Sequence, residues 1–102
     1  RAKSWDTSCP LGPWITVDPD LDVQNLAIRC SVDGQGRQNA NTRDMMHPVA
    51  ELVAYVSQAM TLLPGDVILT GTPAGVGPLE PGNVVTCEIE GLGELSNPVV
   101  RL

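Results

Sequence analysis

The feature of this sequence that most constrains its fold is the regular interruption of short apolar runs by glycine and proline. Among the 102 residues are 10 glycines and 9 prolines, spread along the whole length. Glycine and proline at such short intervals favour short strands joined by turns, and they leave few stretches long enough for a helix. We therefore expect an α+β chain that is mostly β, rather than one of alternating βαβ units.

Alternation of apolar and polar residues predicts the strands. Residues 26–32 alternate in this way, which is typical of a strand with one buried face. Asp33-Gly34 then offers a turn, and residues 37–41 are expected to return as the second strand of a hairpin with a turn longer than two residues. Further strands, each bounded by glycine or proline, are expected at residues 67–72, 84–90 and 94–100.

One main helix is expected over about residues 48–62. Pro48 suits the first helical position because its missing amide hydrogen would have no partner within the helix. The apolar positions that recur at helical spacing are Val49, Leu52, Val53, Val56 and Met60. Pro64 disfavours helical geometry at the residue before it, and Gly65 frees the backbone to turn, so the helix should end there.

Charge and length argue against several classes of function. The net charge is −6 and the six basic residues are scattered, so we expect no nucleic-acid partner. No apolar run approaches the roughly 20 residues that cross a bilayer, and no signal-peptide pattern opens the chain. We expect a soluble, cytoplasmic protein without a membrane partner. The cysteines Cys9, Cys30 and Cys87 lack metal-ligand spacing, and we expect reduced, mostly buried thiols.

Two acidic patterns resemble functional motifs but have simpler explanations. Asp18, Asp20 and Asp22 copy the opening of a calcium loop, yet valine and arginine stand where that loop needs glycine and glutamate. A solvated acidic turn is the expectation. Glu88 and Glu90 point to one face of a strand, as an acid–base pair would. The expectation is that this face is simply the solvent-exposed side of a strand whose other face is buried.

The single histidine and the glycine-rich segment are weighed in the same way. His47 precedes the helix with no acid or thiol at a recognisable spacing, so a capping or packing role is expected. The glycines of residues 71–77 resemble a phosphate-binding loop, but Pro78-Leu79 replace the lysine and hydroxyl residue that such a loop needs. What remains is a strand that runs into a flexible loop whose Thr72 offers a hydroxyl to a carboxylate.

Six blocks of the sequence, taken in order, closely resemble the fumarylacetoacetate hydrolase family. The blocks are residues 3–6, 9–14, 41–45, 50–55, 63–78 and 97–99. The segment Gly71-Thr72-Pro73-Ala74-Gly75-Val76-Gly77 is especially specific, and the resemblance runs from Lys3 to about Val100. It implies a mixed β-sheet roll with one main helix in a protein that usually forms a homodimer.

The resemblance also implies a divalent metal ion, Mg²⁺, Mn²⁺ or Ca²⁺. In the family two glutamates of a Glu-x-Glu motif and an aspartate hold this ion, and all three precede the lysine block. Glu88-Ile89-Glu90 follows that block and is not the motif. Because the chain opens with Arg1 in dense, turn-rich sequence, we expect residues 1–102 to be the C-terminal portion of a single catalytic domain, without the main metal ligands and inactive alone.

Three residues of this chain match functional positions of the family. Lys3 matches the active-site lysine, whose ammonium lies beside the metal and the substrate. Thr72 matches the threonine that hydrogen-bonds the carboxylate or oxo end of the substrate. Thr7 matches a position that helps form a second cation site in some members. Departures from the family pattern at Trp5, His47 and Ser96 touch none of these roles.

The activity that the resemblance implies is metal-dependent hydrolysis or isomerisation of small oxo acids. Members act on 2-oxo acids, 1,3-dicarbonyl compounds and enol dicarboxylic acids, of the acylpyruvate or 2-hydroxyhepta-2,4-diene-1,7-dioate type. In such chemistry a divalent ion stabilises the enolate that forms when a carbon–carbon bond breaks or a proton moves. Two alternatives stay open, namely an oxaloacetate-type decarboxylase on the same scaffold and a non-catalytic β-rich binding domain.

Overall fold

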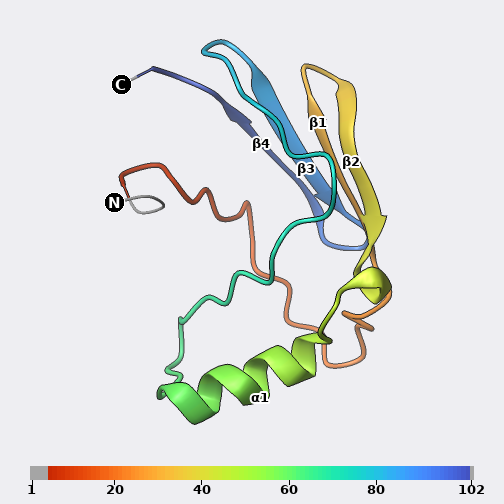
Figure 1. Ribbon diagram of the computed structural model, residues 1–102, viewed down its shortest axis with the longest axis vertical. Coiled ribbons are helices and arrows are strands. Elements are labelled where there is room, and N and C mark those ends of the chain that lie inside the picture. The colour runs from red at the N-terminus through yellow and green to blue at the C-terminus, as the bar shows by residue number, and fades with distance from the viewer. Residues whose placement is uncertain (1–4, 102) are drawn as a thin grey trace.

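A computed structural model describes residues 5–101 of the chain (Figure 1). The elements, in chain order, are β1 (Ala27–Val32), β2 (Gln35–Asn41), the short 3-10 helix η1 (Thr42–Asp44), α1 (Val49–Ala59), β3 (Val84–Ile89) and β4 (Gly93–Pro98). The four strands form one sheet in the order β2-β1-β3-β4, and all three strand pairs are antiparallel. The expected α+β class with one main helix is confirmed.

The β1–β2 hairpin turns more tightly than its sequence suggested. Val32 pairs with Gln35, so β2 begins two residues earlier than expected and Asp33-Gly34 alone make the turn. Both turn residues have positive φ, 51° and 77°, which matches the twist of the flanking strands. The Asp33 carboxylate also accepts hydrogen bonds from Asn83 Nδ2 at 2.8 Å and from Val84 N at 2.7 Å. The turn is thereby tied to the start of β3.

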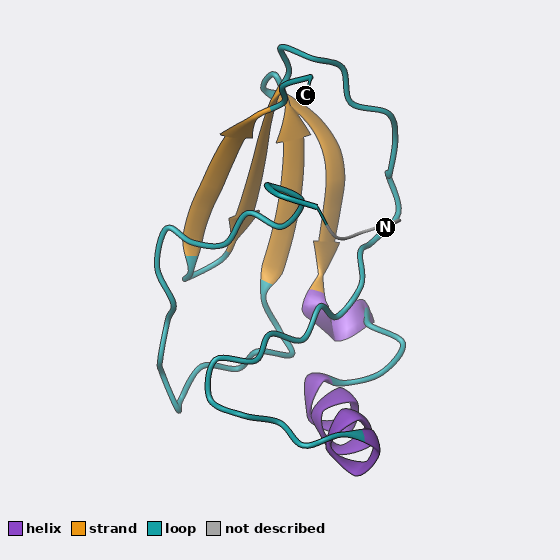
Figure 2. Cartoon of the chain, turned by 90° about the vertical axis from the view of Figure 1, so that its left-hand side faces the viewer, coloured by secondary structure: helices purple, strands orange, loops and turns teal. Residues whose placement is uncertain are grey.

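The expected strand at residues 67–72 is wrong, because this segment forms no strand in the described chain. Its consecutive apolar residues lack a neighbouring strand, and Val67 and Leu69 are 58% and 75% exposed. A strand is stable only where another strand accepts its backbone hydrogen bonds. The segment instead runs as an extended loop from the end of α1 towards the sheet (Figure 2).

The main helix is shorter than the expected range of 48–62. It covers Val49–Ala59, with Pro48 as the residue before its first turn and Met60 already extended at φ −154°. Gln24 Oε1 accepts a hydrogen bond from Val49 N at 2.9 Å, which satisfies one free amide of the first turn. After the helix, Asp66 Oδ2 accepts a hydrogen bond from Leu63 N at 2.8 Å. This bond stabilises a turn at residues 63–66, which disfavours continuation of the helix.

The N-terminal segment crosses to the far end of the sheet. Trp14 Nε1 donates a hydrogen bond to Leu92 O at 2.9 Å, and its ring lies over Gly93 at the start of β4. A Cβ at Gly93 would lie 2.8 Å from this ring, so only glycine leaves room for the tryptophan. This contact joins the beginning of the described chain to its last hairpin.

The described residues bury very little apolar side chain. Leu26 and Val32 are the buried hydrophobic residues, and no residue of α1 is buried. Large apolar side chains remain exposed, including Ile15 at 89%, Val17 at 91% and Met46 at 92%. So many exposed large apolar side chains are typical of a region that packs against further protein. Within residues 5–101, no helix is long and apolar enough to cross a membrane.

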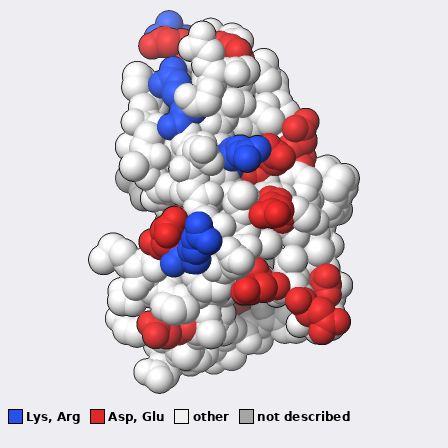
Figure 3. All heavy atoms as spheres, turned by 90° about the vertical axis from the view of Figure 1, so that its right-hand side faces the viewer, with Lys and Arg blue, Asp and Glu red and all other residues white. Residues whose placement is uncertain are grey.

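Charged side chains are mixed on the surface. On the face shown in Figure 3, basic and acidic residues lie beside one another and no continuous basic stripe forms there. The acidic turn near the N-terminal segment is built as expected for a solvated turn. Asp18 Oδ1 accepts from Asp20 N at 2.9 Å and Asp22 Oδ1 accepts from Gln24 N at 3.1 Å.

Candidate functional site

Thr72 lies in the loop after α1, where a side chain of β2 holds it. Gln38 Nε2 donates hydrogen bonds to Thr72 Oγ1 at 2.8 Å and to the Pro73 carbonyl oxygen at 2.8 Å. Both amide hydrogens of the glutamine are therefore used. Because the threonine oxygen accepts from Gln38, the hydroxyl hydrogen is left to donate elsewhere. The pair presents one oriented O–H donor at the edge of the loop.

Gly75 explains why this loop is rich in glycine. A Cβ at this position would lie 2.1 Å from the Arg37 carbonyl oxygen and 3.1 Å from Gln38 Cγ, and φ is 105°. The loop backbone thus lies directly on β2, and both the approach and the dihedral angle exclude a side chain. Gly75 therefore lets the loop that carries Thr72 pack against β2.

A pocket of about 400 Å³ opens beside Thr72. Its walls come from β1, the end of β2, η1, the start of α1 and the loop at residues 70–73. The lining residues are Ile28, Ala40, Asn41, Thr42, Asp44, Met45, Met46, His47, Leu52, Thr70, Gly71, Thr72 and Pro73. A mostly apolar wall with a few polar groups, at this volume, is typical of small-molecule sites.

His47 has neither the capping nor the packing role that was expected. Its side chain is 65% exposed, and no side chain caps the helix at Pro48. Nδ1 lies 3.6 Å from Glu51 Oε2, one helical turn away, and the ring forms part of the pocket wall. The i,i+4 spacing to Glu51 was the one signal in the sequence that could have indicated this pair.

The structure describes one of the other two predicted site residues. Lys3 lies outside the described residues. Thr7 is exposed in a turn closed by the hydrogen bond from Ser8 N to Trp5 O at 3.1 Å, with φ of 68°. It is not among the residues that line the pocket. Of the two predicted residues that the structure describes, Thr72 therefore lines this pocket and Thr7 does not.

The described residues do not fit a metal centre of their own. Between residues 5 and 101, no group of three or more histidine, cysteine, aspartate or glutamate side chains could hold an ion. Hard divalent ions such as Mg²⁺ need several oxygen ligands around one point. A metal ion at this site would need ligands from outside the described chain.

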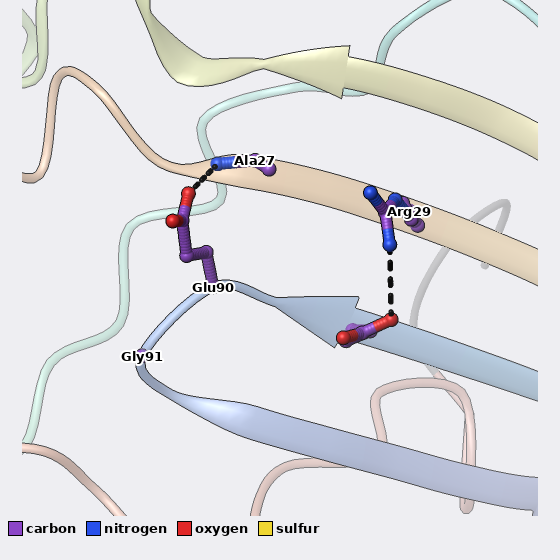
Figure 4. Close-up of a pocket in the computed structure, with 5 residues that line it drawn as sticks. Ala27, Arg29, Glu90 and Gly91 are labelled. Carbon is purple, nitrogen blue, oxygen red and sulfur yellow. Dashed lines mark hydrogen bonds and ion pairs between the residues drawn. The ribbon is translucent and has the colours of Figure 1, made fainter.

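A second hollow, of about 340 Å³, lies on the polar face of the sheet (Figure 4). Arg29 Nη1 lies 4.0 Å from Glu88 Oε2, and Glu90 Oε2 accepts a hydrogen bond from Ala27 N at 3.1 Å. Each carboxylate is already matched by a group of β1, and the Arg29 and Glu88 side chains are 62% and 53% exposed. This arrangement is the wet side of a half-buried strand, as expected, and an exposed pair of this kind contributes about 0–1 kcal/mol.

The fold and the Thr72 pocket together define a class, that of β-rich domains in which a glycine-rich loop forms one wall of a pocket of small-molecule size. Comparison with known proteins then identifies the family. The family described as fumarylacetoacetate (FAA) hydrolase C-terminal matches residues 1–100. The chain belongs to this family, and the resemblance seen in the sequence is confirmed.

Similar proteins include enzymes of several reaction types. The 5-carboxymethyl-2-hydroxymuconate delta-isomerase of Mycobacterium smegmatis is 54% identical with a TM-score of 0.93, over 99% of this chain and 39% of that one. A maleylpyruvate hydrolase of Sphingobium sp. SYK-6, solved with manganese(II) and pyruvate, is 43% identical with a TM-score of 0.91, over 95% and 37%. The mitochondrial oxaloacetate decarboxylase of Dictyostelium discoideum is 50% identical over 89% of this chain and 42% of its own length. This chain thus spans about two fifths of each relative.

Proposed function

We propose that the Thr72 pocket binds the carboxylate or oxo end of a small 2-oxo, 1,3-dicarbonyl or enol dicarboxylic acid in a hydrolase or isomerase. The observation that carries this proposal is the orientation of Thr72 by Gln38 at the wall of a pocket of small-molecule size. A hydroxyl that donates to a carboxylate contributes about 1.5–3 kcal/mol. The isomerase and hydrolase among the relatives support the reaction class.

The charge of the pocket indicates what else such a site requires. Asp44 lines the pocket, Glu51 lies beside His47 at its wall, and none of the lining residues that the structure describes is lysine or arginine. An anionic substrate would be repelled unless cations from elsewhere compensate. We infer that Lys3 and a divalent ion supply this positive charge, with Mg²⁺, Mn²⁺ or Ca²⁺ as candidates. The manganese bound to the maleylpyruvate hydrolase supports this inference. Thr7 as a contributor to a second cation site remains a prediction.

Decarboxylation of a short oxo acid such as oxaloacetate is the second candidate. The relative from Dictyostelium discoideum, named as an oxaloacetate decarboxylase, favours it. Binding of a carboxylate by Thr72 suits either reaction, because both need the acid held in one orientation. We infer further that the protein acts in the cytoplasm as a homodimer, and the exposed apolar surface supports a protein interface.

A chimaeric enzyme tests the proposal directly. Residues 1–102 would replace the matching segment of the Mycobacterium smegmatis isomerase, which is 54% identical over 99% of this chain. We expect Mg²⁺- or Mn²⁺-dependent turnover of an acylpyruvate, an enol dicarboxylate or oxaloacetate. A folded, metal-loaded chimaera that turns over none of these would contradict the catalytic proposal and favour a binding domain.

Thr72→Val in the chimaera tests the role of the hydroxyl. Valine keeps the branched shape and removes the donor, so kcat/KM should fall roughly ten- to hundredfold. Thr61→Val is the matched control, because Thr61 is exposed and does not line the pocket. If Thr72→Val lowers the melting temperature while kcat/KM stays at the parent value, the hydroxyl only stabilises the loop.

A further inference from the structure

Two cysteines face each other across β1 and β3. Cys30 and Cys87 are direct partners in this antiparallel pair. The same pair is hydrogen-bonded where Glu90 N donates to Ala27 O at 2.9 Å and where Asp33 N donates to Val84 O at 2.9 Å. Hydrogen-bonded and non-hydrogen-bonded positions alternate along an antiparallel ladder. Cys30 lies an odd number of residues from both Ala27 and Asp33, so it occupies a non-hydrogen-bonded position.

This position sets the separation of the two thiols. Partners at non-hydrogen-bonded positions have Cα atoms about 4.5 Å apart, and their side chains lie closest together. Disulfides join residues whose Cα atoms are about 4.4–6.8 Å apart. The two sulfur atoms can therefore bond without a movement of the backbone, near the short end of the allowed range.

Within residues 5–101 the pair is accessible to small reagents. Cys87 is exposed, Cys30 is half-buried, and both are free thiols. Partial burial raises the pKa of the Cys87 thiol, and the neighbouring Cys30 thiol raises it further. Their next neighbours in the same row of the sheet are Gln38 and Leu95, which are uncharged.

We propose that Cys30 and Cys87 form a reversible cross-strand disulfide when the protein meets a hydroperoxide. One thiolate attacks the peroxide oxygen, which gives a sulfenic acid and releases hydroxide from hydrogen peroxide. The second thiolate attacks the sulfenic sulfur, forms the S–S bond and releases a second hydroxide. Each hydroxide takes up the proton that one thiol gave up. In sum, two thiols and one hydrogen peroxide give one disulfide and two waters, and a small dithiol reverses the oxidation.

The place of the pair connects it to the Thr72 loop. Gln38, which holds Thr72 and Pro73, is the direct β2 partner of Cys30. Bonding Cys30 to Cys87 fixes the Cys30 side chain on the β3 side and removes its thiol from the surroundings of Gln38. The dithiol itself does not depend on the proposed enzymatic activity.

The test uses the protein with Cys9 and any cysteine outside residues 1–102 replaced by serine, so that only the two paired thiols remain. After hydrogen peroxide, we expect a species without intermolecular disulfides, about 2 Da lighter per chain, that lacks both titratable thiols and regains them with dithiothreitol. Peptide mapping should recover one disulfide-linked Cys30–Cys87 pair. The matched controls, Cys9→Ser/Cys30→Ser and Cys9→Ser/Cys87→Ser, should not form this species.

Three results would overturn the proposal. Both thiols could survive peroxide in the folded protein, oxidation could stop at sulfinic acid, or disulfides could form only between molecules. Circular dichroism of the reduced and oxidised forms shows whether the sheet is retained. A pair that oxidises only after the sheet has unfolded also counts against the proposal, because the reaction would then not depend on the cross-strand geometry.

Discussion

Gln38→Leu is the change that most sharply tests how Thr72 is positioned. Leucine keeps a similar volume but removes the two hydrogen bonds, each 2.8 Å long, to Thr72 Oγ1 and Pro73 O. A hydrogen bond contributes about 0.5–1.5 kcal/mol net, so the loop should lose roughly 1–3 kcal/mol of its attachment to β2. Thr72 would then sample orientations in which its hydroxyl no longer reaches the proposed substrate carboxylate.

The kinetic effect has an upper limit, because Gln38 acts through Thr72. We expect kcat/KM of the chimaera to fall about five- to fiftyfold, no further than the roughly hundredfold limit for removing the Thr72 hydroxyl. Gln38→Glu separates shape from donation, because an ionised carboxylate of equal length cannot donate to either oxygen. It should be as damaging as leucine. Gln58→Leu, on the exposed face of α1, is the matched control and should leave the kinetics unchanged.

A double-mutant cycle decides the matter. If Gln38 acts through Thr72, Gln38→Leu should cost little more once Thr72→Val is present, because the interaction has already been removed. The measurements are kcat/KM and the denaturant midpoint of all four proteins. Additive losses in kcat/KM would refute the reasoning, since Gln38 would then act independently of Thr72.

Three further outcomes follow from single contacts. Gly75→Ala should destabilise the protein by about 1–3 kcal/mol or more, because a Cβ there would clash with the Arg37 carbonyl oxygen. Gly36→Ala is the control, because a Cβ at Gly36 would have nothing within 4 Å, and it should change the denaturant midpoint little. Lys3→Met should lower kcat of the chimaera by about two to four orders of magnitude while circular dichroism stays unchanged, and near-normal turnover would remove Lys3 from the site. Because the pKa of Cys87 is raised in the folded protein, the thiol loses its proton at lower pH in the unfolded chain. The free energy of unfolding should therefore fall as pH rises through the alkaline range. Cys87→Ser should make the free energy of unfolding depend less on pH.

Local chemistry in the sequence predicted most of the sheet. The alternation in residues 26–32 gave β1 with one position of error at its start, and the glycine and proline boundaries located β3 and β4. Strands that are bounded by glycine or proline are predictable, because these residues favour a turn at their own position in the sequence. A turn at Asp33-Gly34 was predicted, but the hairpin loop is shorter than expected because the polar residues of the returning strand hid its first two positions.

The segment at residues 67–72 shows where local chemistry is insufficient. It opens with three consecutive apolar residues that suit a strand, yet the described chain provides no ladder beside it. Composition indicates which residues suit a sheet surface, whereas pairing depends on a partner that is remote in sequence. Apolar spacing alone was likewise insufficient to locate the end of α1. The Asp66 side chain accepts a hydrogen bond from Leu63 N and favours a turn there.

The candidate site divides in the same way. Thr72 was predictable because it lies inside a specific motif. The hydrogen bond from Gln38 that holds Thr72 was not predictable, because Gln38 is 34 residues away in sequence. Nothing in a single sequence pairs a glutamine of one strand with a distant loop. The cysteines were expected to be mostly buried, yet Cys9 and Cys87 are exposed and Cys30 is half-buried. Their cross-strand contact depends on the β1–β3 register, which residue spacing alone does not give.

Two independent properties of the chain indicate that the Thr72 pocket is one wall of a larger site. Within residues 5–101 the pocket lining contains an aspartate and neither lysine nor arginine, although the relatives' names include enzymes that act on anionic acids. The apolar side chains around the sheet and helix are largely exposed, so the described residues leave surface for further protein to cover. Protein packed there could bring both the missing apolar contacts and the missing positive charge. Closing the pocket would also strengthen the Thr72 hydrogen bond, since excluding water raises the electrostatic energy of a donor aimed at a carboxylate.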